Sequence, residues 1–253
     1  MSEHSERINK NSRRMFGGGA EGAVLNVLGA GEVVVEGRMP WSSNTTLLTT
    51  VSCGDETLPA VYKPERGERP LWDYEGGLWR REIATYLVSE ALGWDLVPET
   101  VARFDAPMGQ GSLQRFVDDA DFEQHYFTLY EEPANHDRLR QMCVFDLVIN
   151  NGDRKGGHCL ITSAGYIFGV DHGLTFQTSP RLRTVIWEFG GQPIPDAWRA
   201  DMVRASEEEL PLLDELLAPD EVAAFRRRAR AVAELPCIPQ VSEEYRHYPW
   251  PYV

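Results

Sequence analysis

The chain has 253 residues, 42% of them hydrophobic and 25% charged, and its formal net charge at pH 7 is -14. This composition is typical of a globular protein, and the acidity argues against broad attraction to nucleic acid or to an anionic bilayer. No apolar run reaches the roughly 18 residues that a membrane-spanning helix needs. We therefore expect no stable membrane insertion and a cytoplasmic location.

The first half of the chain has the patterns of a small antiparallel sheet. Residues 1–18 are polar and end in glycines, which predicts a flexible tail. AEGAVLNVLGAG then favours a short helix, while EVVVEG, TTLLTTVSC and LPAVYKP favour strands. Apolar residues three and four apart predict a helix from Tyr74 to Leu92, which Gly93 is placed to end. TVARFDAP and GSLQRFV predict a second hairpin.

Beyond Val117 the pattern is mostly helical. DADFEQHYFTLYEE and HDRLRQMCVFDLVIN are predicted helices, and the turn TSAG joins the predicted strands HCLI and YIFGV. The remainder favours helices again, including PDEVAAFRRRARAVAEL and SEEELPLLDELL, in which Ser206 and Glu209 have the spacing of a capping box.

This order of elements predicts an α+β fold with two lobes and a cleft between them. A sheet with one embedded helix comes first, and a mostly helical half follows. We expect a tail at residues 1–18, an N-lobe at 19–117 and a C-lobe at 118–253, which together form one catalytic domain.

Lys63 and Glu82 are candidates for a functional ion pair. Lys63 ends a predicted strand, where its ammonium group would neutralise nucleotide phosphates in a phosphotransferase; a surface Lys at a strand end is the alternative. Glu82 lies near the apolar, inward-facing side of its helix, and a carboxylate there needs a cation. Lys63 is the predicted partner, although Arg80 and Arg81 are also near and Glu82 could instead be exposed.

Two Asp residues and a His lie around the predicted HCLI/YIFGV hairpin. Asp153 follows the helix that ends in INN, although a Gly-flanked Asp is often only a turn residue. His158 starts the first strand and Asp171 follows the second, so antiparallel pairing should bring all three to one mouth of the hairpin. This set suits metal-assisted phosphoryl transfer, in which one acid accepts or orients a hydroxyl proton and the other holds a divalent ion.

With these residues the chain resembles the phosphoinositide 3-/4-kinase-like superfamily, particularly the type II phosphatidylinositol 4-kinases and their bacterial relatives. The similarity covers roughly residues 35–200, through VYKP, REIATYLVSEALGWDLVPET, GSLQRFV, NNGDRKGGH, GVDHG and LRTVIWEF. In overall character the chain is similar to a group of actinobacterial proteins of this superfamily, and HipA-type kinases share the catalytic-loop pattern more distantly. The resemblance implies a two-lobed protein-kinase-like fold, with a catalytic hairpin in the C-lobe.

The resemblance also implies a role for each matched residue. Lys63 would contact the phosphates of ATP, and Glu82 would orient Lys63. Asp153 would be the catalytic acid, and Asp171 would be a ligand of Mg²⁺ or Mn²⁺. Further ATP contacts would come from a loop over the phosphates, Ser42, Ser43 and Asn44, and from a hinge beside adenine, Gln114, Arg115, Phe116 and Val117.

Two positions depart from the pattern of the family. His158 stands where the family has an Asn, five residues after the catalytic Asp, and the metal-binding triplet is Asp171, His172, Gly173. Because Mg²⁺ prefers oxygen ligands and imidazole suits softer ions, His158 as a ligand predicts strong support of activity by Mn²⁺, or a single-metal site. In the alternative, His158 only packs or hydrogen-bonds near the loop. Asp146 is predicted to support the loop through hydrogen bonds.

The phosphoryl acceptor is less well defined by the sequence. Arg181 and Arg183 could hold an anionic acceptor, although Arg on an exposed loop is more often solvated. The Cys-rich lipidated insert of the type II lipid kinases has no counterpart here, so a lipid head group and a soluble molecule both stay open. The alternatives are a HipA-like protein kinase, a nucleotidyl transferase and a nucleotide-binding pseudokinase. An enzyme is favoured over a pseudokinase because the chain has all four of Lys63, Glu82, Asp153 and Asp171.

Overall fold

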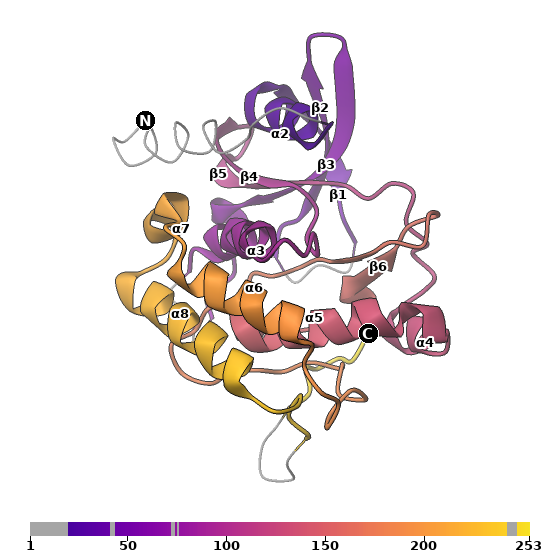
Figure 1. Cartoon of the computed structure of the whole chain (residues 1–253). Helices are drawn as coiled ribbons and strands as arrows, with labels where there is room; N and C mark the ends of the chain where they lie inside the picture. The colour runs from indigo at the N-terminus through magenta and orange to yellow at the C-terminus, as the bar shows by residue number, and fades with distance from the viewer. Residues whose placement is uncertain (1–19, 41–43, 72–73, 75, 242–246) are drawn as a thin grey trace. The chain divides into compact units, whose positions relative to one another are not determined.

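The computed structural model describes residues 20–40, 44–71, 74, 76–241 and 247–253, in two compact units. The first unit comprises described residues of Met1–Tyr86, Pro98–Asp118 and Pro211–Leu217, and the second those of Leu87–Val97, Asp119–Leu210 and Ala218–Val253. Figure 1 labels their helices and strands. The expected tail at 1–18 lies outside the described residues, and the expected lobe limits stay predictions.

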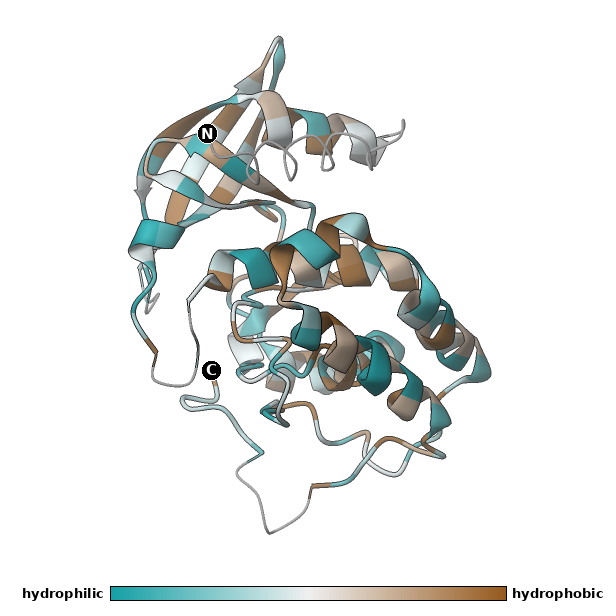
Figure 2. Cartoon of the chain, turned by 90° about the vertical axis from the view of Figure 1, so that its left-hand side faces the viewer, coloured by the Kyte–Doolittle hydropathy of each residue, from teal (hydrophilic) through white to brown (hydrophobic). Residues whose placement is uncertain are grey.

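A five-stranded antiparallel sheet forms the first unit. Its strands are β1 (Glu32–Arg38), β2 (Leu47–Cys53), β3 (Glu56–Pro64), β4 (Thr100–Ala106) and β5 (Gly109–Arg115), in the order β1-β2-β3-β5-β4. Burial alternates along β2, as expected for a sheet with one buried face, and Figure 2 shows hydrophobic and hydrophilic residues interspersed along the strands. Val51, Tyr62 and Leu113 are fully buried on this sheet. The predicted α+β class and both predicted hairpins are confirmed.

Both helices predicted for the first half of the chain are present, and a third belongs to the first unit. α2 (Ala20–Ala30) packs against β2, β3, β4 and β5, α3 (Leu78–Leu92) starts in this unit, and α7 (Pro211–Leu216) also belongs to it. α3 begins at Leu78 rather than at Tyr74, because Gly76 and Gly77 have φ angles of 89° and 70°, which an α-helix does not accommodate. Gly93, with a φ of 71°, follows its last residue as predicted.

The second unit is mostly helical and contains the predicted short hairpin. Its elements are α4 (Tyr126–Tyr130), α5 (His136–Ile149), β6 (Cys159–Ile161), β7 (Ile167–Gly169), α6 (Asp196–Glu207) and α8 (Pro219–Glu234). α8 packs against both α5 and α6. β6 and β7 pair in antiparallel register, with Cys159 opposite Gly169. Within the described ranges, no helix combines the length and the apolar character that crossing a membrane requires.

Two details of the helix prediction were wrong. Residues 118–125 are not helical, because Asp121 accepts hydrogen bonds from the Glu123 amide and the Gln124 side chain, and this local turn competes with a helix. Ser206 does not cap a helix. It lies buried inside α6 and donates its hydroxyl to the carbonyl of Val203.

Candidate active site

Lys63 and Glu82 form an ion pair within the first unit. Lys63 lies on β3, opposite Ser112 of β5, and Glu82 lies on α3. The Lys63 Nζ and Glu82 Oε1 atoms are 2.5 Å apart, and the two side chains are 21% and 3% exposed. The buried carboxylate thus has the cation that it needs, and it holds the more exposed ammonium group in place. The predicted pairing is present, while its role toward a nucleotide stays a prediction.

The loop predicted to cover the phosphates is described only in part. Ser42 and Ser43 lie outside the described residues. Asn44 accepts a hydrogen bond on Oδ1 from the backbone amide of Arg69, at 2.9 Å. This contact fixes the end of the loop, and a role of Asn44 toward phosphate stays a prediction.

The predicted hinge, residues 114–117, begins in β5 and continues beyond its end. Its contacts hold it against neighbouring segments of the first unit, and its role beside adenine stays a prediction. The partners are the Thr100 hydroxyl for Gln114, the Glu99 carboxylate for Arg115 and the Pro59 carbonyl for the Phe116 amide, and Val117 is buried.

In the second unit, the loop that carries Asp153 starts where Asn150 ends α5. Asn150 has a left-handed backbone, with φ 55° and ψ 54°, which a helix cannot continue. Its side chain donates to the carbonyls of Gln177 and Ser179 and accepts from the amide of Arg181. One Asn side chain therefore fastens the segment that follows Asp171 to the end of α5.

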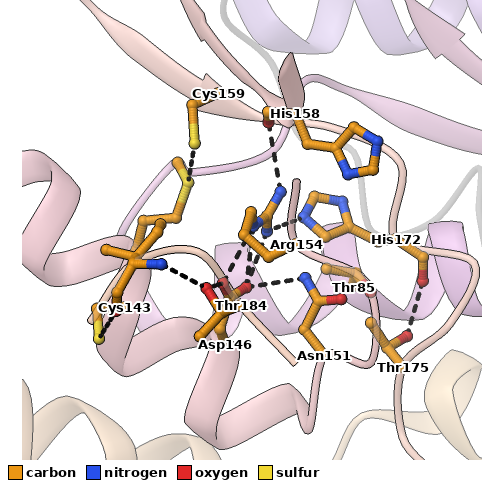
Figure 3. A network of polar contacts seen from close by, with 12 residues as sticks. Thr85, Cys143, Asp146, Asn151, Arg154, His158, Cys159, His172, Thr175 and Thr184 are labelled. Atoms are coloured by element: carbon orange, nitrogen blue, oxygen red, sulfur yellow. Dashed lines mark hydrogen bonds and ion pairs between the residues drawn. The ribbon is translucent and has the colours of Figure 1, made fainter. Parts of the chain in front are cut away.

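Asn151 and Asp146 fix the backbone of Asp153. The Asp153 amide donates to Asn151 Oδ1 at 3.0 Å, and Asn151 Nδ2 donates to Asp146 Oδ1 at 2.9 Å. Asp146 is fully buried and also accepts hydrogen bonds from Arg154 and Thr184 (Figure 3). The predicted supporting role of Asp146 is confirmed.

The Asp153 carboxylate has an unusual electrostatic environment. Burial raises its pKa to about 6, Lys155 and Arg183 oppose this rise, and the charge of Asp171 adds to it. Its side chain is 26% exposed, and Lys155 Nζ lies 3.4 Å from its Oδ2. A carboxylate with a pKa this close to neutrality is suited to accept a proton at physiological pH.

His158 and Asp171 meet at the mouth of the β6–β7 hairpin, as predicted. The Val170 amide donates to the His158 carbonyl, and His158 Nε2 lies 3.4 Å from Asp171 Oδ2. Asp171 is 55% exposed on its side chain, and its charge reaches Asp153. His158 Nδ1 accepts a 3.3 Å hydrogen bond from the Lys155 amide, so Nε2 is the ring nitrogen that carries the proton in this arrangement.

This carboxylate and imidazole fit a divalent ion in spacing and chemistry. Two ligands at right angles, each about 2.1 Å from an ion, lie roughly 3 Å apart, close to the separation between His158 and Asp171. Among the described residues no group of three or more His, Cys, Asp or Glu side chains is arranged for a metal ion. Mg²⁺ commonly uses one or two carboxylates together with phosphates and water, so the donor set suits an ion that arrives with a nucleotide.

Arg181 and Arg183 line a cavity of about 870 Å³ in the second unit, together with Trp187 and His247. The Arg183 amide donates to the Asn151 carbonyl at 2.8 Å, so this wall of the cavity is bonded to the loop that carries Asp153. The side chains that line it suit an anionic molecule with an apolar or planar part.

Arg154 is a residue of this site that sequence reasoning missed. Its side chain is 0% exposed, and its Nη2 atom lies 2.9 Å from Asp146 Oδ1. An available signal was the predicted hydrogen bonding of Asp146, since a buried carboxylate requires a donor and Arg154 follows it by only eight residues. The common preference of Arg for the surface concealed it.

Comparisons with known proteins identify a family and a relative of this chain. The family described as phosphatidylinositol 3- and 4-kinase matches residues 89–217, which include Asp153, His158 and Asp171. Protein Rv2133c of Mycobacterium tuberculosis is 40% identical over 267 residues, covering 89% of this chain and 94% of that protein.

Two solved structures are similar to this chain. The structure of hydra Fam20 with sugar has a TM-score of 0.50 and 14% identity, and the match covers 92% of this chain and 94% of that one. The Helicobacter pylori proinflammatory kinase CtkA has a TM-score of 0.45 and 12% identity, with 83% and 94% covered.

Proposed function

The chain belongs to the phosphatidylinositol 3- and 4-kinase family, and from this premise we propose that it is an ATP-dependent kinase whose acceptor is a hydroxyl group of a lipid head group or small molecule. Family and fold support a phosphotransferase. One observation supports the finer proposal: Asp153, whose pKa is near 6, interacts electrostatically with Asp171. Asp171 in turn meets His158 at the mouth of the β6–β7 hairpin.

Each residue has a separate task in the proposed reaction. Lys63, held by Glu82, neutralises charge on the phosphates of ATP. Asp153 orients the acceptor hydroxyl and accepts its proton as the hydroxyl oxygen bonds to the γ-phosphorus, while the bond from that phosphorus to the β-phosphate oxygen breaks and ADP leaves. Asp171, with His158 beside it, would hold a divalent ion, which would supply positive charge to the phosphates. Ser42, Ser43 and Asn44 complete the phosphate contacts, and residues 114–117 contact adenine.

The cavity lined by Arg181 and Arg183 is our proposed acceptor site. The charge of Arg183 lowers the pKa of Asp153, so Arg183 acts within electrostatic reach of the proposed base. Guanidinium groups recognise phosphate and carboxylate with paired hydrogen bonds. An acceptor anchored there by an anionic group would present its hydroxyl toward the loop of Asp153.

Radiolabelled ATP separates the kinase from the alternatives. With γ-labelled ATP, Mn²⁺ and a mixture of anionic metabolites and phosphatidylinositol vesicles, we expect label in the metabolite or lipid fraction. Label on protein from γ-labelled ATP would instead indicate a HipA-like protein kinase, and label from α-labelled ATP a nucleotidyl transferase. If Mg·ATP raises the Tm but no label moves to any fraction, the chain is a pseudokinase and the proposal is wrong.

The Lys63–Glu82 pair predicts strongly coupled mutations. Glu82→Gln leaves the ammonium group charged but without its carboxylate, and we expect kcat/KM for ATP to fall about 10- to 100-fold. In Lys63→Met the loss should be larger, and adding Glu82→Gln to it should cost little more, because the interaction is already gone. Steady-state kinetics at saturating acceptor measures all three variants. Glu56→Gln, an exposed change on the same strand, is the control, and additive losses would contradict the pairing.

His158 predicts a metal preference that can be measured. If Nε2 binds the ion, its proton must leave and the 3.3 Å bond to the Lys155 amide must rearrange. We then expect Mn²⁺ to support higher activity than Mg²⁺, and His158→Asn to shift that ratio toward Mg²⁺ by about tenfold. Activity titrations with each ion test this. Equal activity with the two ions, in both wild type and variant, would leave His158 only a hydrogen-bonding partner of Asp171.

A further inference from the structure

Arg154 is fully buried, and all three nitrogens of its guanidinium group have partners. Nε and Nη2 lie 2.9 to 3.2 Å from the carboxylate oxygens of Asp146. Nη2 also lies 2.7 Å from His172 Nε2, and Nη1 donates to the carbonyls of Val170 at 3.1 Å and His158 at 3.3 Å. Figure 3 shows Arg154 between Asp146 and His172. Because a buried charge is costly unless it is paired and hydrogen-bonded, this arrangement resists displacement.

Asp171 lies between two of these partners in the chain. Its φ angle is 60°, a left-handed conformation that is unfavourable for a non-glycine residue. Arg154 binds the carbonyl of Val170 before it and the ring of His172 after it. The guanidinium group therefore anchors the backbone on both sides of the strained residue, as expected where surrounding contacts maintain an unfavourable conformation.

The same ion pair also reaches Asp153. Arg154 follows Asp153 directly, and its amide donates to the Arg183 carbonyl at 2.9 Å. On the other side, Asp146 holds Asn151, whose side chain accepts the Asp153 amide. Asp153 is thus held on both sides. Asn151, which accepts its amide, is bonded to Asp146, and Arg154, which follows it, forms the ion pair with Asp146.

Gly169 leaves room for the guanidinium group. A Cβ atom at this position would lie 3.2 Å from both Nη1 and Nη2 of Arg154 and 3.3 Å from His172 Nε2. Its φ angle is not in the left-handed region, so Ala is compatible with the backbone there. Gly169→Ala should therefore displace the guanidinium group while Arg154 and Asp146 are both retained.

We infer that the Asp146–Arg154 ion pair is a positioning unit that couples the backbone of Asp153 to that of Asp171. Arg154 acts through His172, Val170 and the loop, and it does not touch substrate. The catalytic consequence rests on the proposed function, whereas the coupling of the two backbone segments does not.

Hydrogen exchange, measured on the metal-free full chain, tests the coupling without any activity. We expect Gly169→Ala to speed amide exchange about tenfold or more in both the 151–156 and the 170–174 segments, at a temperature where circular dichroism shows the protein to be folded. Arg154→Lys keeps the charge opposite Asp146 but loses the planar fork, and it should act in the same way. Gly29→Ala, in α2 with nothing within 4 Å of its Cβ, is the control. If only the 170–174 segment responds, or neither does, the inference is wrong.

Kinetics then tests the catalytic consequence. We expect kcat to fall about 10- to 100-fold in Gly169→Ala and Arg154→Lys, with KM for ATP within about twofold of wild type, because misplacement of reacting groups mainly affects the chemical step. If the loss of activity in each variant is no larger than the fraction of protein that is unfolded, Arg154 has only a structural role. If the wild type transfers no phosphate, the proposed function fails, and the exchange result alone decides the inference.

Discussion

We expect the replacement of Asp153 by Asn to lower kcat by at least about 10²- to 10³-fold, while the fold and the affinity for ATP are retained. This is the result that we expect if Asp153 accepts the hydroxyl proton, since losing one preorganised catalytic group costs an enzyme about this much. Asn has the shape of Asp and keeps the backbone hydrogen bond to Asn151, but it cannot take up a proton. Single-turnover measurements at saturating ATP separate this chemical step from binding. Turnover near the wild-type rate would reject the assignment.

The same substitution should raise stability above pH 6. Burial lifts the pKa of Asp153 from its ordinary 3.8 to about 6, against the opposing charges of Lys155 and Arg183 and with the added effect of Asp171. The folded state therefore binds this proton more tightly than the unfolded state, and ionisation destabilises the wild type increasingly from about pH 4 to pH 6. Asn removes this cost, which is about 1–3 kcal/mol at pH 7.

Urea unfolding of the metal-free protein at pH 4.5 and pH 7 measures the effect. The variant should gain on wild type as pH rises, whereas Asp55→Asn, an exposed turn change, should show no such trend. If the protein becomes more stable when Asp153 is replaced, it has retained a destabilising carboxylate, as expected for a group that is needed for catalysis. A variant that is less stable than wild type at pH 7 would mean that burial of Asp153 is not the dominant effect.

Local patterns predicted most of the fold. The strand-forming composition of EVVVEG and TTLLTTVSC, and the apolar spacing of α3, are properties of a single element, so they are readable without tertiary contacts. The errors arose where turn-forming residues override a helical pattern at the start of an element. Gly76 and Gly77 adopt positive φ angles and delay α3, and Asp121 stabilises a turn where helical residues were expected.

The site was predictable to a similar degree, for the same reason. His158 and Asp171 converge because hairpin pairing follows from the sequence of the two strands and their turn. The need of Asp146 for a donor pointed to a nearby cation, but the full burial of Arg154 could not be predicted. It depends on the Val170 carbonyl and the His172 ring, which become partners of Arg154 only when the hairpin packs onto the loop. The pKa of Asp153 likewise depends on burial by distant residues, for which sequence carries no local signal.

Asp171→Asn should abolish metal-dependent nucleotide binding. Asp171 has a left-handed backbone, which Asn tolerates better than Ala, so this variant removes the charge with little added strain. We expect the affinity for Mn²⁺ in the presence of ATP to fall by at least about 10²-fold, because the carboxylate is the anionic ligand that we assign to the ion. Calorimetry or Mn²⁺ paramagnetic titration measures it. Asp95→Asn is a matched control, since Asp95 is an exposed Asp that also has a positive φ, 48°.

A second reading of Asp171→Asn separates metal binding from general electrostatics. The charge of Asp171 raises the pKa of Asp153, so its removal should move that pKa downward in the metal-free protein, which NMR titration of the Asp153 carboxyl detects. A bound divalent ion should move it in the same direction in the wild type, because a cation replaces the net negative charge at Asp171. A variant that loses Mn²⁺ affinity and shows the lower pKa without metal identifies Asp171 as both the ligand and the electrostatic neighbour of the base. Unchanged Mn²⁺ affinity would reject the role of Asp171 as a ligand. An unchanged pKa of Asp153 would mean that the two carboxylates do not interact, so that a bound ion could not change the pKa of Asp153 through Asp171.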